Sequence, residues 1–130
     1  MTLAELCLPA FALLNLLCIG VAKFSAIRQF NNADPRNEAF YATGLRQRAL
    51  GAQNNGFEAF PLFAAAVLLA EWRQGPQGLI DGLAAAFILV RIGYVAAYLG
   101  NKPSLRSLLW GLALCLSLAI FFTPIYAHGG

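Results

Sequence analysis

The sequence predicts an all-α integral membrane protein, one four-helix bundle (residues 1–130) that crosses the bilayer four times. Of its 130 residues, 59% are hydrophobic and 12% are charged, whereas about 25% are charged in a typical soluble domain. Four apolar stretches alternate with polar connections, and a helix of about 20 apolar residues spans a bilayer core. Lipid solvates apolar side chains that would cause aggregation in water.

The first span is expected over residues 3–28. Residues 3–21 form an apolar run rich in Leu and Ala, and Lys23 and Arg28 mark the point where the helix leaves the membrane. A cleaved signal peptide begins with positive charge, but the only early charge here is Glu5. We therefore expect a membrane span.

The second helix is expected over residues 40–72, after a polar loop at residues 31–38. Its apolar part, residues 57–70, is short for a span, so the helix has to begin before it enters the hydrocarbon. Trp72 is expected at interfacial depth, and the Gly-Pro pair at residues 75–76 ends the helix.

The third and fourth spans are expected over residues 79–100 and 104–126. The turn between them contains Gly, Asn, Lys and Pro, and Ser104 is a candidate N-cap for the fourth helix. Pro124 lies in the last turn, where proline bends or ends a helix. His128, the only histidine, lies in a short tail that offers no geometry for a metal or catalytic role.

Basic residues divide unevenly between the connections. The first connection carries Arg28, Arg36, Arg46 and Arg48, the third carries Lys102 and Arg106, and the second carries Arg73. Because positively charged loops stay in the cytoplasm, connections one and three should face the cytoplasm and both termini the outside. These residues form no phosphate-reading face, so no nucleic-acid partner is expected.

The three cysteines, Cys7, Cys18 and Cys115, all lie in apolar runs without a CxxC spacing. Cysteines in such runs are typically small buried hydrophobes. We therefore expect neither a disulfide nor a metal site.

Polar residues beside or within the spans are the candidate functional residues, because an ionisable group at membrane depth costs about 2.5–3.5 kcal/mol. Asn55 and Glu58 share one face of the second helix. Arg91, Tyr94 and Tyr98 share one face of the third. Both faces lie toward the cytoplasmic end, where we expect a pocket for an anionic or zwitterionic ligand.

Arg106 begins the fourth helix at the same end and would join that pocket. An alternative is an ion pair between Glu58 and Arg91 that only stabilises the bundle. Such a pair does not require two tyrosines, an asparagine and a second arginine at the same level, which favours a ligand pocket.

Three segments resemble the MAPEG superfamily, the membrane-associated proteins in eicosanoid and glutathione metabolism. Residues 48–63, Arg-Ala-Leu-Gly-Ala-Gln-Asn-Asn-Gly-Phe-Glu-Ala-Phe-Pro-Leu-Phe, are similar to its signature of an Arg-rich helix start, Ala-Gln, an Asn, a Glu three residues later and an aromatic-Pro-Leu-Phe run. Residues 91–100 (Arg-Ile-Gly-Tyr-Val-Ala-Ala-Tyr-Leu-Gly) resemble the family's third helix, and residues 105–107 (Leu-Arg-Ser) resemble the start of its fourth. The segments occur in the family's order.

The resemblance implies a homotrimer that binds glutathione, as co-substrate, between neighbouring subunits near the cytosolic side. By position it gives glutathione-binding roles to Arg28, Gln53, Asn55, Glu58, Arg91, Tyr94 and Tyr98, and the thiol-activating role to Arg106. A free thiol has a pKa of about 8.5, and a guanidinium at a helix start favours the thiolate. No metal is implied.

One position departs from the family pattern. Some members carry, seven residues before the Glu, an arginine that binds a glutathione carboxylate, and this chain has Gly51 there. Arg48, one turn earlier, is a candidate substitute.

The chain resembles bacterial-type members and microsomal glutathione transferases, which implies an enzyme of the bacterial inner membrane with its site toward the cytoplasm. It would transfer glutathione to lipophilic electrophiles or reduce lipid hydroperoxides, with the lipophilic partner arriving from among the membrane lipids. Two alternatives stay open. One is a non-catalytic member that binds a lipid or a partner protein, and the other is a small proton-coupled exporter, which needs Glu58 deep in a span.

Overall fold

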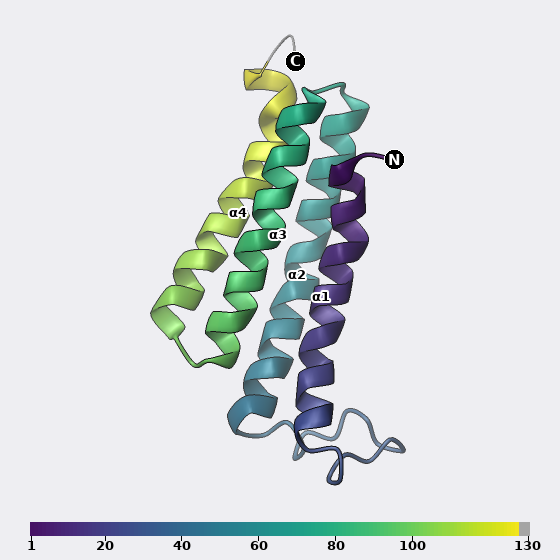
Figure 1. The fold of residues 1–130 in the computed structure, drawn as a ribbon, viewed down its shortest axis with the longest axis vertical. Coiled ribbons are helices and arrows are strands. Elements are labelled where there is room, and N and C mark those ends of the chain that lie inside the picture. The colour runs from purple at the N-terminus through teal and green to yellow at the C-terminus, as the bar shows by residue number, and fades with distance from the viewer. Residues whose placement is uncertain (128–130) are drawn as a thin grey trace.

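Four α-helices run alternately up and down in the computed structural model of the protein, which describes residues 1–127 (Figure 1). They are α1 (Leu3–Ser25), α2 (Gly44–Trp72), α3 (Gln77–Leu99) and α4 (Pro103–Tyr126). The predicted all-α fold of four helices is therefore confirmed. The prediction about His128 lies outside the described residues.

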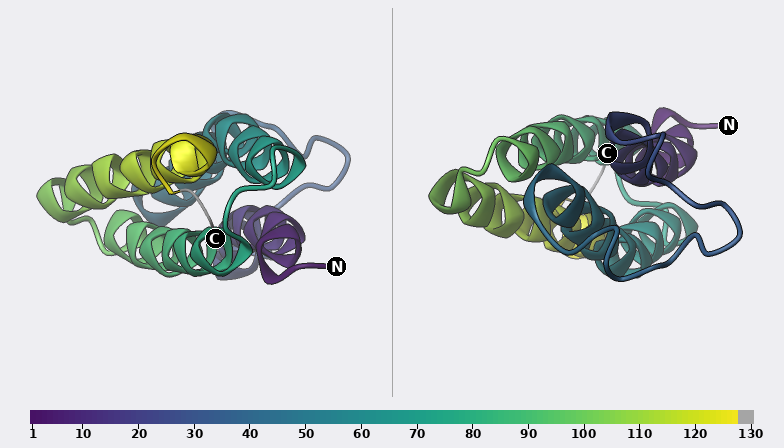
Figure 2. Two further views of the ribbon diagram at one scale, coloured as in Figure 1. Left: turned by 90° about the horizontal axis from the view of Figure 1, so that it is seen from above. Right: turned by 90° about the horizontal axis from the view of Figure 1, so that it is seen from below.

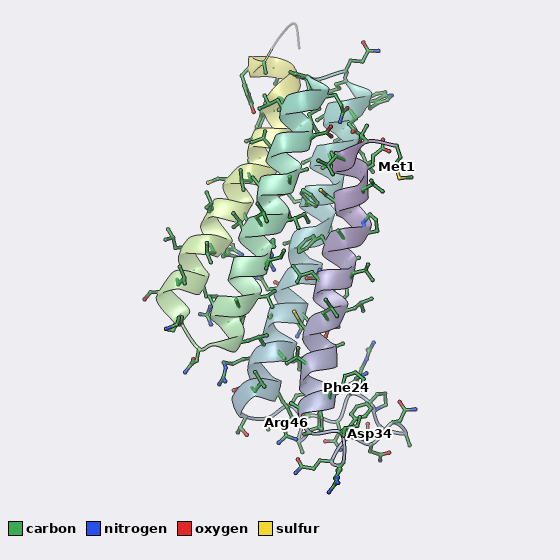
Figure 3. The ribbon with its side chains drawn as sticks, in the orientation of Figure 1. Met1, Phe24, Asp34 and Arg46 are labelled. Atoms are coloured by element: carbon green, nitrogen blue, oxygen red, sulfur yellow. The ribbon has the colours of Figure 1, made fainter. Side chains whose placement is uncertain are left out.

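The two middle helices of the sequence hold the bundle together. α2 and α3 contact each other and both of the outer helices, α1 and α4, and the end-on views show α1 and α4 at opposite corners (Figure 2). The long α1–α2 loop and the α3–α4 turn lie at one end, and the α2–α3 turn lies at the other (Figure 1). The two basic connections therefore share one end, with Asp34 and Arg46 far from Met1 (Figure 3).

Within residues 1–127, three helices are long and apolar enough to cross a membrane: α1, α3 and α4. α2 is the longest helix, at 29 residues, but its first half carries Arg46, Arg48 and several amide side chains. These polar residues lower its hydropathy. The prediction of four spans is thus supported for three helices.

α2 begins at Gly44, and the prediction that it begins at residue 40 is wrong. Thr43 is extended, and Gly44 has a positive φ of 67°, which glycine adopts without strain. Phe40 and Tyr41 are buried with Ala22 of α1. Packing of these two rings against α1 turns the chain away from a helical path before Gly44.

Two further boundaries differ from the prediction. α1 ends at Ser25, short of residue 28, and the Ser25 hydroxyl donates to the carbonyl of Ala22 at 2.8 Å. α4 begins at Pro103, so the prediction of Ser104 as N-cap is wrong. Proline fits the first helical position because it has no N–H to satisfy and its φ is preset.

Hydrogen bonds to carboxylates hold the end of the bundle where the chain starts. Thr2 Oγ1 donates to Glu71 Oε2 at 2.6 Å, and the backbone N–H of Ala4 donates to Asp81 Oδ1 at 2.9 Å. Gln77 Nε2 donates to both carboxylates, and α3 starts at this residue, ahead of its predicted start. These bonds tie α1, α2 and α3 together at the end opposite the basic connections.

The core changes character along the bundle. Toward the termini it is apolar and aromatic, with the rings of Phe63 and Phe87 stacked at a centroid distance of 3.9 Å and Phe11 packed edge-on against both. Further toward the loop end, Asn15 and Arg91 are fully buried. The polar part of the core lies beside the candidate site.

The cysteines divide by position. Cys7 and Cys18 are buried, as predicted. Cys18 Sγ donates to the carbonyl of Leu14 at 3.4 Å. Cys115 is exposed, so the prediction that it is buried is wrong. α4 is an outer helix, and this face of it points away from the bundle.

Candidate functional site

A cavity of about 400 Å³ lies between α2, α3 and α4 toward the loop end of the bundle. Its lining residues are Gly51, Asn54, Asn55, Glu58, Tyr94, Tyr98, Arg106, Ser107 and Trp110. Most of the predicted site residues are among them. Helical spacing places those of α2 and α3 on shared faces, and the packing of α4 against both helices closes the cavity.

Two arginines flank a pair of tyrosines along this side of the bundle. Arg91 Cζ lies 3.9 Å from the ring centroid of Tyr94, and the Tyr94 and Tyr98 rings meet edge to face at 5.8 Å. Arg106 Cζ lies 4.7 Å from the Tyr98 ring. Because a guanidinium is attracted to the face of an aromatic ring, α3 positions an arginine that belongs to α4.

Arg91 is fully buried, and its Nη1 donates to Asn55 Oδ1 at 2.9 Å. Its Nε and Nη2 have no hydrogen-bond partner within residues 1–127. The alternative of a structural ion pair between Glu58 and Arg91 is therefore wrong. Asn55 accepts the hydrogen bond from the guanidinium, and Glu58 lines the cavity.

Glu58 is exposed at the edge of the cavity, beside Asn55. A proton-coupled exporter would need this carboxylate deep inside the bundle. The exposed position instead suits contact with the ammonium group of a bound ligand.

Arg106 and Ser107 lie in the first two turns of α4. The backbone N–H groups at a helix start and the positive end of the helix dipole favour anions. The guanidinium of Arg106 adds a full positive charge at the same place. This side of the cavity can therefore stabilise a carboxylate or a thiolate.

Comparison with known protein families gives a match to the MAPEG family over residues 3–126. The chain belongs to the MAPEG family. Membership together with the three apolar spans makes it an integral membrane protein. No curated protein and no solved structure matches the chain.

Gly51, where some MAPEG members carry arginine, lies directly against Tyr98. A Cβ atom built on Gly51 would overlap the Tyr98 hydroxyl and lie 2.7 Å from Tyr98 Cζ. The phenol thus fills the space that a side chain at position 51 would use. Nearby, Arg48 Nε donates to the carbonyl of Leu99 at 3.1 Å, and Arg48 lines an adjoining hollow that Arg106 also lines.

Arg28 and Gln53 do not join the cavity in this MAPEG protein. Arg28 is exposed in the α1–α2 loop. Gln53 lines a separate groove of about 550 Å³ on the α1 side of α2, together with Lys23 and Arg36. Their predicted roles in glutathione binding stay predictions.

The sequence analysis did not single out Trp110 of the cavity lining or Asn15 of the buried core. Trp110 lines the cavity one turn after Arg106, and its four-residue spacing from Arg106 is the sequence signal that could have identified it. Asn15 is fully buried against Gly56, and both polar atoms of its amide lack a partner within residues 1–127. Its signal was a lone polar residue inside the first apolar run.

Proposed function

We propose that this MAPEG protein is a membrane-bound glutathione-dependent enzyme that transfers glutathione to lipophilic electrophiles, reduces lipid hydroperoxides, or does both. The observation that carries the proposal is the cavity in which Arg106 meets Asn55, Glu58, Tyr94 and Tyr98. MAPEG membership supports glutathione as the thiol. A volume of about 400 Å³ falls within the usual range for small-molecule sites.

Glutathione carries two carboxylates, one ammonium group and one thiol, and the cavity offers matching chemistry. Arg106 would attract an anionic group, and Glu58 would accept the ammonium. The phenol of Tyr98 and the free amide hydrogens of Asn55 add uncharged hydrogen-bond donors.

Arg106 would act on the thiol. A positive charge beside a thiol favours its ionised form, and the thiolate is the nucleophile. In transfer, the sulfur forms a bond to the electrophilic carbon, whose leaving group departs with its electron pair. In peroxide reduction, the sulfur takes the terminal oxygen, which releases an alcohol. A second glutathione then displaces water from the sulfenic acid to give the disulfide.

Membrane topology and assembly complete the proposal. We infer that α2 also crosses the bilayer, because it packs along α1 and α3, which are both apolar spans. The basic connections would face the cytoplasm of a bacterial inner membrane, with the site at that end and both termini outside. In a homotrimer, Arg28 and Gln53 of one subunit could complete the site of a neighbour.

The test is glutathione binding by calorimetry in mild detergent, with thiolate ultraviolet absorbance measured on the same samples. We expect micromolar to millimolar affinity and a thiolate signal that Arg106→Ala abolishes. Arg73→Ala, an exposed change at the opposite end of α2, should leave both unchanged. No binding to the wild type at millimolar glutathione would overturn the proposal.

The alternative of a non-catalytic MAPEG member has one observation in its favour, the replacement of a family arginine by Gly51 with Tyr98 packed on it. It predicts glutathione or lipid binding without thiolate formation. The absorbance measurement therefore separates the two functions.

A further inference from the structure

The groove of about 550 Å³ on the α1 side of α2 lies where α1, α2 and the α1–α2 loop meet. Its α1 side consists of Leu16, Ile19 and Lys23, which are three and four residues apart and therefore share one helical face. Its α2 side is a second helical face, made by Leu50, Gln53, Asn54 and Phe57. The groove therefore follows two antiparallel helices along the bundle.

Arg36 reaches the groove from the α1–α2 loop. Tyr41 is buried in a cluster with Ala22 of α1, and its hydroxyl donates to the carbonyl of Pro35 at 3.0 Å. Pro35 directly precedes Arg36, and both residues line the groove. A packed ring and a hydrogen bond thus hold the loop where it presents a basic side chain to the groove.

The charge of the groove is confined to the loop end of the bundle. Lys23 lies two residues before the end of α1, at the same end as Arg36. Leu16 is seven residues earlier, which is about 10 Å of helix, and Phe57 is level with Leu16 because the adjacent residues Asn15 and Gly56 are in contact. Leu16 and Phe57 are 52% and 45% exposed. Within residues 1–127, no Asp or Glu lines the groove.

This order of basic and apolar groups matches that of an anionic phospholipid. α1 is an apolar span, so Lys23 near its end belongs at the interface and Leu16 in the hydrocarbon. A phospholipid likewise has its phosphate at the interface and its acyl chains below. A soluble anion would match the basic end alone, whereas an uncharged lipid would match the apolar end alone.

We propose that the groove binds one anionic phospholipid, with its phosphate between Lys23 and Arg36 and the first part of one acyl chain against Leu16, Ile19 and Phe57. The site goes beyond the proposed function, because it requires neither glutathione nor Arg106. The phosphate uses Lys23 and Arg36 only, so Gln53 stays free for its proposed role in the site of a neighbouring subunit.

The test is a lipid titration of the delipidated, glutathione-free protein in mild detergent, with bound lipid counted by native mass spectrometry. Dioleoyl-phosphatidylglycerol and dioleoyl-phosphatidylcholine are the probes, because they share their acyl chains and a phosphate and differ in net charge. An attraction of roughly fivefold per basic residue predicts that the anionic lipid binds roughly 25-fold more tightly. Equal affinity for the two lipids would overturn the proposal.

Two double variants with the same net charge locate the lipid. Lys23→Gln with Arg36→Gln should remove most of the preference for the anionic lipid. Arg73→Gln with Lys102→Gln is the matched control and should keep the preference, since both residues are exposed and lie outside the groove. Equal loss of the preference in both double variants would show attraction to the protein's net charge and overturn the proposal.

Glycerol 3-phosphate, which has a phosphate and no acyl chain, separates a lipid site from a site for a soluble phosphate. At millimolar concentration it should leave the bound phosphatidylglycerol in place. Displacement of the lipid would show that the acyl chain contributes nothing and would overturn the assignment to a lipid. Because every sample is free of glutathione, these outcomes do not depend on whether the candidate site binds it.

Discussion

The phenol of Tyr98 lies directly on the α2 backbone at Gly51, with Cζ 2.7 Å from the position that a Cβ of residue 51 would occupy. The same ring also contacts α4, because Arg106 Cζ lies 4.7 Å from its centroid. Three helices are thereby linked through one tyrosine. Because Gly51 has no side chain, the Tyr98 ring can approach the α2 backbone closely. The ring in turn positions Arg106 of α4.

Gly51→Ala should therefore weaken glutathione binding. The new methyl group overlaps the Tyr98 hydroxyl, so the ring has to move and Arg106 loses its contact. Arg106 is then no longer held in position beside the ligand, so glutathione affinity measured by calorimetry should fall, by at most about tenfold for a cation–π contact of about 1–2 kcal/mol. The new methyl group would also lie 2.7 Å from Tyr98 Cζ, so only loss of the whole ring removes the overlap. In Tyr98→Ala the ring is gone, and adding Gly51→Ala to it should have a smaller effect. An equal effect in both backgrounds would show that the Gly51–Tyr98 contact is not the cause.

Arg106→Gln should raise the pKa of the bound glutathione thiol. The guanidinium favours the thiolate, so its removal raises the pKa of the thiol toward that of free glutathione. The pKa rises by about one unit for about 1.4 kcal/mol of lost attraction. Thiolate absorbance followed from pH 6 to pH 10 measures the midpoint, where wild type should ionise at the lower pH. Arg106→Lys keeps the charge and should lie between them. Superimposable curves for wild type and Arg106→Gln would show that Arg106 does not stabilise the thiolate.

Gly56→Ala should destabilise the bundle. A Cβ at Gly56 would overlap the buried amide of Asn15, and this overlap would push α1 and α2 apart. Overpacking of this kind costs about 1–3 kcal/mol. Denaturant titration in detergent measures the free energy of unfolding. The matched control is Gly82→Ala, where the added atom meets nothing within 4 Å and helix propensity predicts a small gain. Asn15→Ala should relieve the overlap. A double-mutant cycle of Gly56→Ala and Asn15→Ala therefore tests whether contact between these two residues causes the loss of stability.

Tyr41 should make the α1–α2 loop sensitive to alkaline pH. Burial raises the pKa of the Tyr41 phenol above its usual value near 10, and its hydroxyl donates to the carbonyl of Pro35 at 3.0 Å. Because the pKa is higher in the folded state, the contribution of the Tyr41 phenol to the free energy of unfolding is complete below the unfolded-state pKa. It is lost as pH rises through the folded-state pKa. Ultraviolet titration should show a tyrosine that ionises late and disappears in Tyr41→Phe. If Tyr41→Phe instead lost a tyrosine that ionises near pH 10, the usual value of about 10 for the side chain, the burial of this phenol would be contradicted.

The sequence by itself determined the helices and most residues of the candidate site. Long apolar runs can be helices only, because a helix satisfies its own backbone in lipid, so four helices and their order follow from composition and turn residues. Fixed helical geometry likewise put Asn55 with Glu58 on one face and Tyr94 with Tyr98 on another. The departures came where side chains far apart in sequence decide the outcome, as at residues 40–43, where two rings pack on α1 instead of continuing α2.

Only the tertiary structure decided which polar groups are partners. Spacing alone allowed Arg91 to pair with Glu58, but the packing of α2 against α3 gives it Asn55. The burial of Asn15, the seat of Tyr98 on Gly51 and the cavity beside Arg106 all arise between helices. Helical periodicity fixes the direction of a side chain within its own helix. The neighbour that it meets depends on how the helices rotate and approach one another, and close packing of the whole bundle sets that.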